Sequence, residues 1–147
     1  MRHVHLETRI RAPTEHVWAF LCDTSQWDDW DPRHSHTDFT GQVDEVGTTW
    51  IEASRLMGFQ MRTTQEVVEV EPQRLLHYHT DSGPAEAYYR LDAEGDMTRF
   101  TFDCDFEMPS RMPGFIQDFM VSRANRYPEQ ALADFKALAE KDFHAQS

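Results

Sequence analysis

The strictest pattern in the chain is an alternation of apolar and polar residues near residue 100. Large apolar side chains at every second position alternate with threonine and acidic residues: Phe100, Phe102, Cys104, Phe106 and Met108. Successive side chains of a β-strand point to opposite faces, so this segment predicts a strand with one buried face. The chain must therefore fold a sheet whose buried face covers other apolar groups.

Further strands are predicted on both sides of the first helical segment. Residues 4–10 alternate in the same way, and residues 36–106 are strand-like throughout. Turn signals interrupt the long stretch at five places: residues 41–47, 55–58, 71–73, 81–84 and 93–96. This spacing predicts six strands joined by hairpins after the first strand, which makes seven strands in all.

Helices are predicted after the first strand and at the end of the chain. Pro13 stops the strand, and a short helix follows with Val17, Phe20 and Leu21 on one face. Residues 23–32 predict one or two further turns that carry two tryptophans. A long helix follows residue 114, and its apolar stripe keeps its phase across Pro128, which favours one kinked helix.

The order of elements predicts an α+β fold: a strand, short helices, six strands and a long helix. No linker, internal repeat or low-complexity tract divides the sequence, so residues 1–147 are expected to form a single domain.

Composition limits the classes of partner. The net charge of −12 argues against nucleic acids and anionic lipid surfaces. No segment has the length and apolarity of a transmembrane helix, the first residues lack a signal-peptide pattern, and the two cysteines are typical of a reducing compartment. We therefore expect a cytoplasmic protein without stable membrane insertion. The acidic residues Asp23, Asp28, Asp29 and Asp31 are expected to form a solvated surface.

Residues 10–32 carry a family resemblance: a strand runs into Ala12-Pro13, a short helix follows, and Trp27 and Trp30 come next. This segment resembles the opening of the START-like, or polyketide cyclase/dehydrase-like, superfamily (SRPBCC, Bet v 1-like). Residues 41–50, 70–78 and 89–102 are similar to later hairpins of that superfamily. The resemblance implies a helix-grip fold, in which a curved seven-stranded antiparallel sheet wraps around the C-terminal helix and leaves an apolar cavity between them.

The resemblance transfers no catalytic residue, because the superfamily shares no short catalytic motif. Candidate ligand contacts therefore come from the faces that should meet across the cavity: Trp50, Tyr89, Phe102, Phe106, Met120, Arg123 and Tyr127. Arg123 is expected either to orient a ligand oxygen or to extend from the edge of the stripe into solvent. Apolar or turn-forming residues at loop tips are expected to gate the cavity mouth: Leu56, Met57, Phe59, Gly83 and Pro84.

Six of the eight histidines form His-x-His pairs, at residues 3/5, 34/36 and 77/79. Residues two apart on a strand share a face, so each pair could offer two imidazoles to one metal ion. The sequence supplies no third ligand, and His3 and His5 are expected on the solvent face, so we predict no metal and no cofactor. His77 and His79, with Tyr89 and Arg123, remain candidates for acid–base catalysis.

Three functions follow from these expectations. The first is binding of a small hydrophobic or aromatic molecule, such as a lipid or polyketide, between sheet and helix. The alternative is a cofactor-free enzyme resembling polyketide aromatase/cyclases, which requires at least two titratable side chains close together in the cavity. A second alternative is a co-chaperone-like interaction module that uses the apolar loops. A homodimer through a sheet edge or these loops is compatible with the pattern.

Overall fold

The structure is a computed structural model that describes residues 2–56, 59–81, 85–107 and 113–146. For residues 2, 55, 56, 59, 116–127 and 146 the course of the backbone is described, but not the side chains. Within these ranges, no helix combines the length and apolarity needed to span a bilayer.

Seven antiparallel strands form one sheet in the order β1-β7-β6-β5-β4-β3-β2. They are β1 (Arg2–Ile10), β2 (Ser35–Thr37), β3 (Thr49–Leu56), β4 (Phe59–Glu71), β5 (Leu75–Thr80), β6 (Ala85–Glu94) and β7 (Met97–Phe106). The first two strands in the chain lie at opposite edges, because the helices between them carry the chain across the sheet. The seven strands and their hairpins confirm the predicted order.

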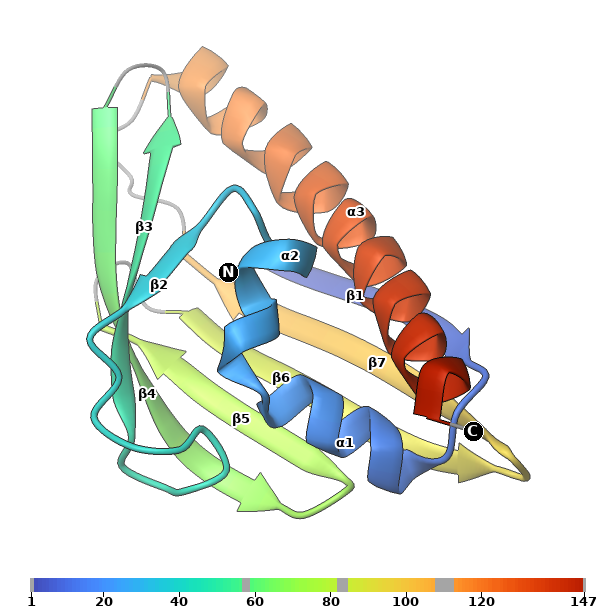
Figure 1. Ribbon diagram of the computed structural model, residues 1–147. Coiled ribbons are helices and arrows are strands. Elements are labelled where there is room, and N and C mark those ends of the chain that lie inside the picture. Colours follow the sequence, from blue (N-terminus) through green and yellow to red (C-terminus); the bar gives the residue numbers. More distant parts are fainter. Residues whose placement is uncertain (1, 57–58, 82–84, 108–112, 147) are drawn as a thin grey trace.

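The helices also follow the predicted order: α1 (Thr14–Cys22), the 3₁₀ helix η1 (Thr24–Gln26), α2 (Trp27–Trp30) and α3 (Gly114–Gln146). Helix α1 buries Val17, Phe20 and Leu21, the three residues that its sequence places on one face. Helix α3 continues through Pro128 as one helix (Figure 1).

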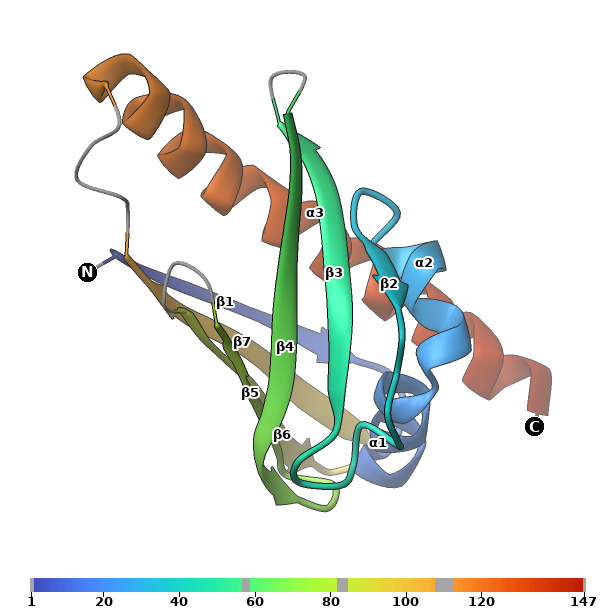
Figure 2. The same ribbon diagram turned by 90° about the vertical axis from the view of Figure 1, so that its left-hand side faces the viewer.

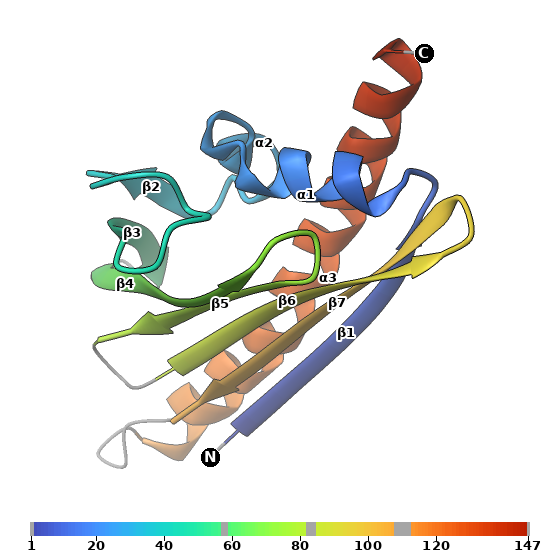
Figure 3. The same cartoon turned by 90° about the horizontal axis from the view of Figure 1, so that it is seen from below.

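The sheet is strongly curved. Strands β3 and β4 stand steeply against β6 and β7, and α3 crosses the concave side (Figures 1 and 2). A bulge in β4 between Val67 and Glu69 contributes to this curvature, because an extra residue bends the strand that carries it. Helices α1 and α2 lie on the same side of the sheet as α3 (Figure 3). The arrangement confirms the helix-grip fold that the family resemblance implied.

An aromatic contact fixes the C-terminal half of α3 against the sheet. The ring of Phe135 stacks on that of Phe100 in β7, with centroids 4.6 Å apart and an interplanar angle of 8°. Phe20 and Trp30 pack edge-on against Phe135, each with centroids 5.3 Å away. Phe135 and Phe100 are each 1% exposed, so this contact lies at the centre of the core.

Replacing Phe135 by alanine should destabilise the protein by about 3–5 kcal/mol, because it removes a buried ring and leaves a cavity. Urea unfolding measures this loss. The matched control is Phe115→Ala in the same helix, where the side chain is 70% exposed and the expected change stays within about 0.5 kcal/mol. Equal losses from both variants would contradict the assignment of Phe135 to the core.

Candidate functional site

A cavity of about 230 Å³ lies between the concave face of the sheet and α3. Strands β3 to β7, the end of α2 and the second half of α3 contribute its walls. The lining residues are Trp30, Asp31, His34, Glu52, Gln65, Tyr78, Thr80, Ala85, Ala87, Tyr89, Phe100, Phe102, Cys104, Pro128, Ala131, Leu132 and Phe135. The cavity is thus mainly aromatic and aliphatic. Its acidic and imidazole groups come from the segment after α2 and from β3.

Two tyrosines form part of the wall and remain neutral. Burial raises the pKa of Tyr78 and that of Tyr89 well above the ordinary value. The rings of the two tyrosines lie side by side in the wall, with centroids 6.1 Å apart. Burial likewise raises the pKa of the Cys104 thiol to about 12, which makes this cysteine unreactive at neutral pH.

The end of α2 directs Asp31 into the cavity. The amide of Asp31 donates to the carbonyl of Trp27 over 2.8 Å and so closes the last helical turn. Pro32 follows, and a proline ring sterically disfavours the helical conformation of the residue before it. The chain therefore leaves the helix at Asp31. The Asp31 carboxylate therefore lies at the cavity wall, where Oδ1 accepts a hydrogen bond from Nδ1 of His34 over 2.9 Å.

The pairing of β2 with β3 adds two more titratable groups. His36 of β2 lies directly opposite Glu52 of β3 in the register, and His36 Nε2 is 3.6 Å from Glu52 Oε1. The same nitrogen lies 3.3 Å from Asp31 Oδ2, and Nδ1 lies 3.1 Å from Asp28 Oδ1. The side chain of His36 is only 3% exposed, so this imidazole supports the cluster from behind the cavity wall.

The charges in this cluster stabilise one another. Burial alone would raise the pKa of Asp31, but hydrogen bonds from His34 and His36 outweigh it and hold the pKa below its ordinary value. Burial alone would lower the pKa of each histidine, but the hydrogen bonds to Asp31 outweigh it and raise both values. Asp31 is therefore an ionised hydrogen-bond acceptor between two imidazoles.

Glu52 shifts in the opposite direction from Asp31. Burial raises the pKa of Glu52, and attraction to His34 and His36 only partly offsets this effect. Two carboxyl groups of the same cavity are thus driven apart in pKa, an arrangement that separates the roles of acid and base in many active sites. The site can hold a polar ligand group and can also exchange protons with it.

Two tryptophans support the polar end of the cavity. Trp50 is fully buried, and its indole N–H donates to Glu52 Oε1 over 3.3 Å. Trp30 lines the cavity, and its indole N–H is buried without a hydrogen-bond partner among the described residues. An unpaired buried donor is costly, so this group is ready to donate to a ligand atom.

Four of the predicted ligand contacts can be located in the structure. Tyr89 and Phe102 line the cavity, whereas Trp50 lies behind its wall and Phe106 is half-buried beyond its edge. The other three predicted contacts belong to the part of α3 whose side chains lie outside the described residues: Met120, Arg123 and Tyr127. Their roles stay predictions.

The predicted gate also lies outside the described residues. This applies to Met57, Gly83 and Pro84, and to the side chains of Leu56 and Phe59.

His77 and His79 do not face the cavity, which corrects their selection as candidate acid–base groups of that site. In β5, Leu76 is buried and Tyr78 lines the cavity, so the alternation turns both histidines to the outer face. There they bind Glu86: His77 Nε2 lies 2.7 Å from Oε2, and His79 Nδ1 lies 2.8 Å from Oε1. The sequence left both orientations of β5 open.

Asp31 is the main residue that the sequence analysis assigned wrongly. It was expected on a solvated acidic surface, but it lines the cavity and binds His34 and His36. The pattern contains a usable signal: an acidic residue before proline at the end of a short helix, followed within five residues by a His-x-His pair. The sequence identified that pair only as potential metal ligands.

The helix-grip fold and the cavity between sheet and helix define a START-like protein. A family model described as polyketide cyclase/dehydrase and lipid transport matches residues 1–140. The chain therefore belongs to this family, as the resemblance indicated. No curated protein sequence matches the chain.

Solved structures share this fold at low sequence identity. The protein TTHA0849 from Thermus thermophilus superposes with a TM-score of 0.79 at 18% identity, covering 99% of this chain and 100% of that one. The Zhui aromatase/cyclase from a Streptomyces species has a TM-score of 0.81 at 17% identity, covering 95% and 94%. A START superfamily protein from Mycobacterium smegmatis has a TM-score of 0.73 at 13% identity, covering 95% and 97%.

The free energy of unfolding should fall as the pH rises above the ordinary histidine pKa of 6.5. Because folding raises the pKa of His34 and His36, their contribution is complete below 6.5 and is lost as the pH passes through the raised values. Ionisation of Glu52, which burial opposes, acts in the same direction. The contribution of Asp31 is lost only in acid, below its ordinary value of 3.8.

Urea unfolding at several pH values between about 5.5 and 9 measures this slope. His36→Gln should show a shallower fall than the wild type, because it removes one of the two imidazoles whose pKa folding raises. A wild-type stability that is flat or rising above pH 6.5 would contradict the assignment.

Proposed function

We propose that the cavity binds a small aromatic or polyketide-like molecule of one or two rings, with an oxygen substituent at the end formed by Asp31, His34 and Glu52. The observation that carries this proposal is the cavity itself, with aromatic walls and with two carboxyl groups and one imidazole among its lining. An interaction module would need no such cavity. The family description, which includes both cyclases and lipid transport, supports an apolar ligand.

The volume limits the size of the ligand. A dry cavity of roughly 150 Å³ accepts benzene, so the 230 Å³ of this cavity suits one or two fused rings. The rings of Tyr89, Phe100 and Phe102 offer dispersion contacts to a flat ligand. The unpaired indole N–H of Trp30 offers a hydrogen bond to a ligand oxygen.

Filling the cavity should abolish binding of a two-ring probe such as 2-naphthol. Ala87 lines the cavity from β6, and Ala87→Phe places a ring in the space that the probe needs. We expect at least about a tenfold loss of affinity, because a ligand ring buried in an apolar site contributes more than 1.4 kcal/mol. Titration calorimetry measures the change.

The matched control is Ala93→Phe, the same substitution at an exposed position of β6, which should bind 2-naphthol like the wild type. Naphthalene, which lacks the hydroxyl, should bind more weakly than 2-naphthol by roughly tenfold, about the contribution of one hydrogen bond. Thermal unfolding confirms that Ala87→Phe is folded. Undiminished binding by folded Ala87→Phe would reject this cavity as the ligand site.

A second function, cofactor-free proton transfer, is favoured by the arrangement of the titratable groups. His34 Nδ1 is hydrogen-bonded to the ionised Asp31, which orients the imidazole ring at the cavity wall. Glu52 is the carboxyl group of raised pKa in the same cavity. We propose that His34 removes a proton from a carbon next to a ligand carbonyl and that Glu52 donates a proton to the carbonyl oxygen, giving the enol.

Deuterium exchange into 2-tetralone tests this second function. The wild type should accelerate exchange next to the carbonyl, and His34→Gln should slow the protein-dependent rate by about 10²–10⁴-fold, as expected for loss of a general base. NMR measures the exchange, and binding of 2-naphthol by the same variant separates catalysis from binding. A wild-type rate equal to that of Ala87→Phe would leave the cavity as a binding site alone.

A further inference from the structure

His3 and His5 lie on the outer face of the sheet, opposite to the cavity. Val4 is buried on the inner face of β1, so the alternation along the strand turns the histidines on either side of it outward. Each imidazole is 54% exposed. Neither group belongs to the cavity or to the cluster around Asp31.

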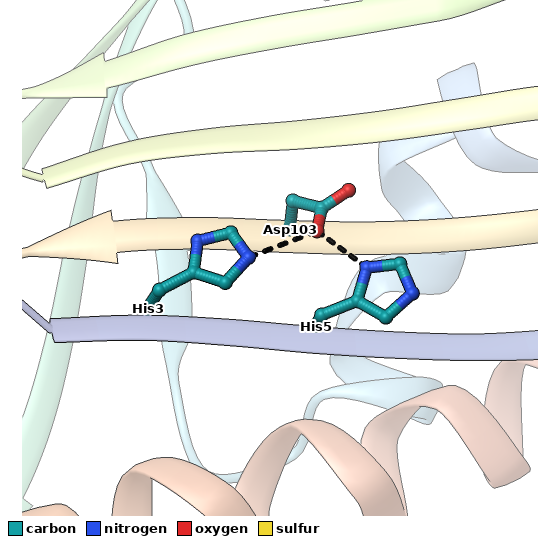
Figure 4. A group of neighbouring side chains, drawn as sticks. All are labelled: His3, His5 and Asp103. Carbon is teal, nitrogen blue, oxygen red and sulfur yellow. Dashed lines mark hydrogen bonds and ion pairs between the residues drawn. The ribbon is translucent and has the colours of Figure 1, made fainter.

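The neighbouring strand supplies the third group that the sequence alone does not locate. Asp103 of β7 is the register partner of His5, and its carboxylate lies between the two imidazoles (Figure 4). Asp103 Oδ1 is 3.3 Å from Nε2 of His3 and 2.6 Å from Nδ1 of His5. These three ligand atoms all lie within 4.8 Å of one another.

The surrounding side chains orient these groups as they do in known metal sites. Nδ1 of His3 lies 2.5 Å from Asp105 Oδ1, so Asp105 accepts the proton on that nitrogen and leaves Nε2, the nitrogen facing Asp103, for coordination. Arg90 Nη1 donates to Asp103 Oδ2 over 2.9 Å, which leaves Oδ1 toward the histidines. A carboxylate behind a coordinating histidine is typical of zinc sites.

We propose that His3, His5 and Asp103 form a binding site for a divalent transition metal ion of the zinc class, with two imidazole nitrogens and one carboxylate oxygen as ligands. Metal–ligand distances of about 2.0–2.1 Å in a tetrahedron separate neighbouring ligand atoms by roughly 3.3 Å. The pair of His3 and Asp103 already has this spacing. His5 moves outward by about 0.7 Å when the metal replaces the proton it shares with Asp103. Water completes the fourth position.

The other histidine pair on this face provides a comparison. His77 and His79 bind different oxygens of Glu86, so their nitrogens do not converge on one atom. The ring of His77 also stacks on Tyr88, with centroids 4.1 Å apart. His77→Gln is therefore a matched control for His5→Gln, because both remove one imidazole from the same face.

Titration of tag-free protein with ZnCl₂, followed by calorimetry and by competition with a chromophoric chelator, tests the site. The wild type should bind one zinc ion at this site, and His5→Gln and Asp103→Asn should each lose that equivalent. Asp105→Asn should keep it with an affinity about 10–100-fold lower, the usual effect of removing a group that orients a ligand. His77→Gln should bind like the wild type.

Each other outcome overturns the proposal. If the wild type binds no zinc, or if the double variant His3→Gln/His5→Gln retains the same equivalent, the metal site does not lie here. The same conclusion follows if His77→Gln weakens zinc binding as much as His5→Gln does. Histidine side-chain NMR of the wild type should show zinc-induced shifts at His3 and His5 first. Far-UV circular dichroism checks that each variant is folded.

Discussion

The stacking of Phe135 on Phe100 is the contact on which the rest of the site depends. It fixes α3 in the concave side of the sheet, and Ala131 and Leu132, one turn earlier in the helix, then face the same side as Phe135 and line the cavity. Helices α1 and α2 reinforce this contact, because Phe20 and Trp30 pack against the same ring of Phe135. The volume available to a ligand is therefore set by the packing of two rings outside the polar cluster.

The polar cluster persists in an apolar setting because its members compensate one another. A buried charge is tolerated when it is paired and hydrogen-bonded, and Asp31 has two imidazole partners. Glu52 has the indole N–H of Trp50 and the imidazole of His36 close to the same oxygen. Because burial and pairing balance differently at the two sites, the pKa of Asp31 is lowered and that of Glu52 is raised. This difference is the basis of the proposed proton transfer.

The sequence predicted the fold well because the fold rests on local signals: a period of two in β1 and β7, prolines at helix boundaries and turn residues between strands. It predicted the site only in part. Phe102 followed from the alternation of its own strand. The contact of His36 with Glu52, in contrast, depends on the register of a three-residue edge strand. Which side chains of β5 point to the cavity, and how the turn after α2 directs Asp31 inward, likewise depend on tertiary packing. The position of Asp103 beside His3 and His5 required the pairing of strands about 100 residues apart.

Strand β7 serves two sites with alternate residues. Phe102 and Cys104 line the cavity, while Asp103 and Asp105 face outward toward the histidines of β1. A shift of one residue exchanges the faces of a strand. An insertion or deletion of a single residue before Phe102 would therefore put carboxylates into the aromatic wall and rings into solvent at the same time. An insertion or deletion inside this strand keeps both faces intact only if it spans two residues or is compensated by a bulge.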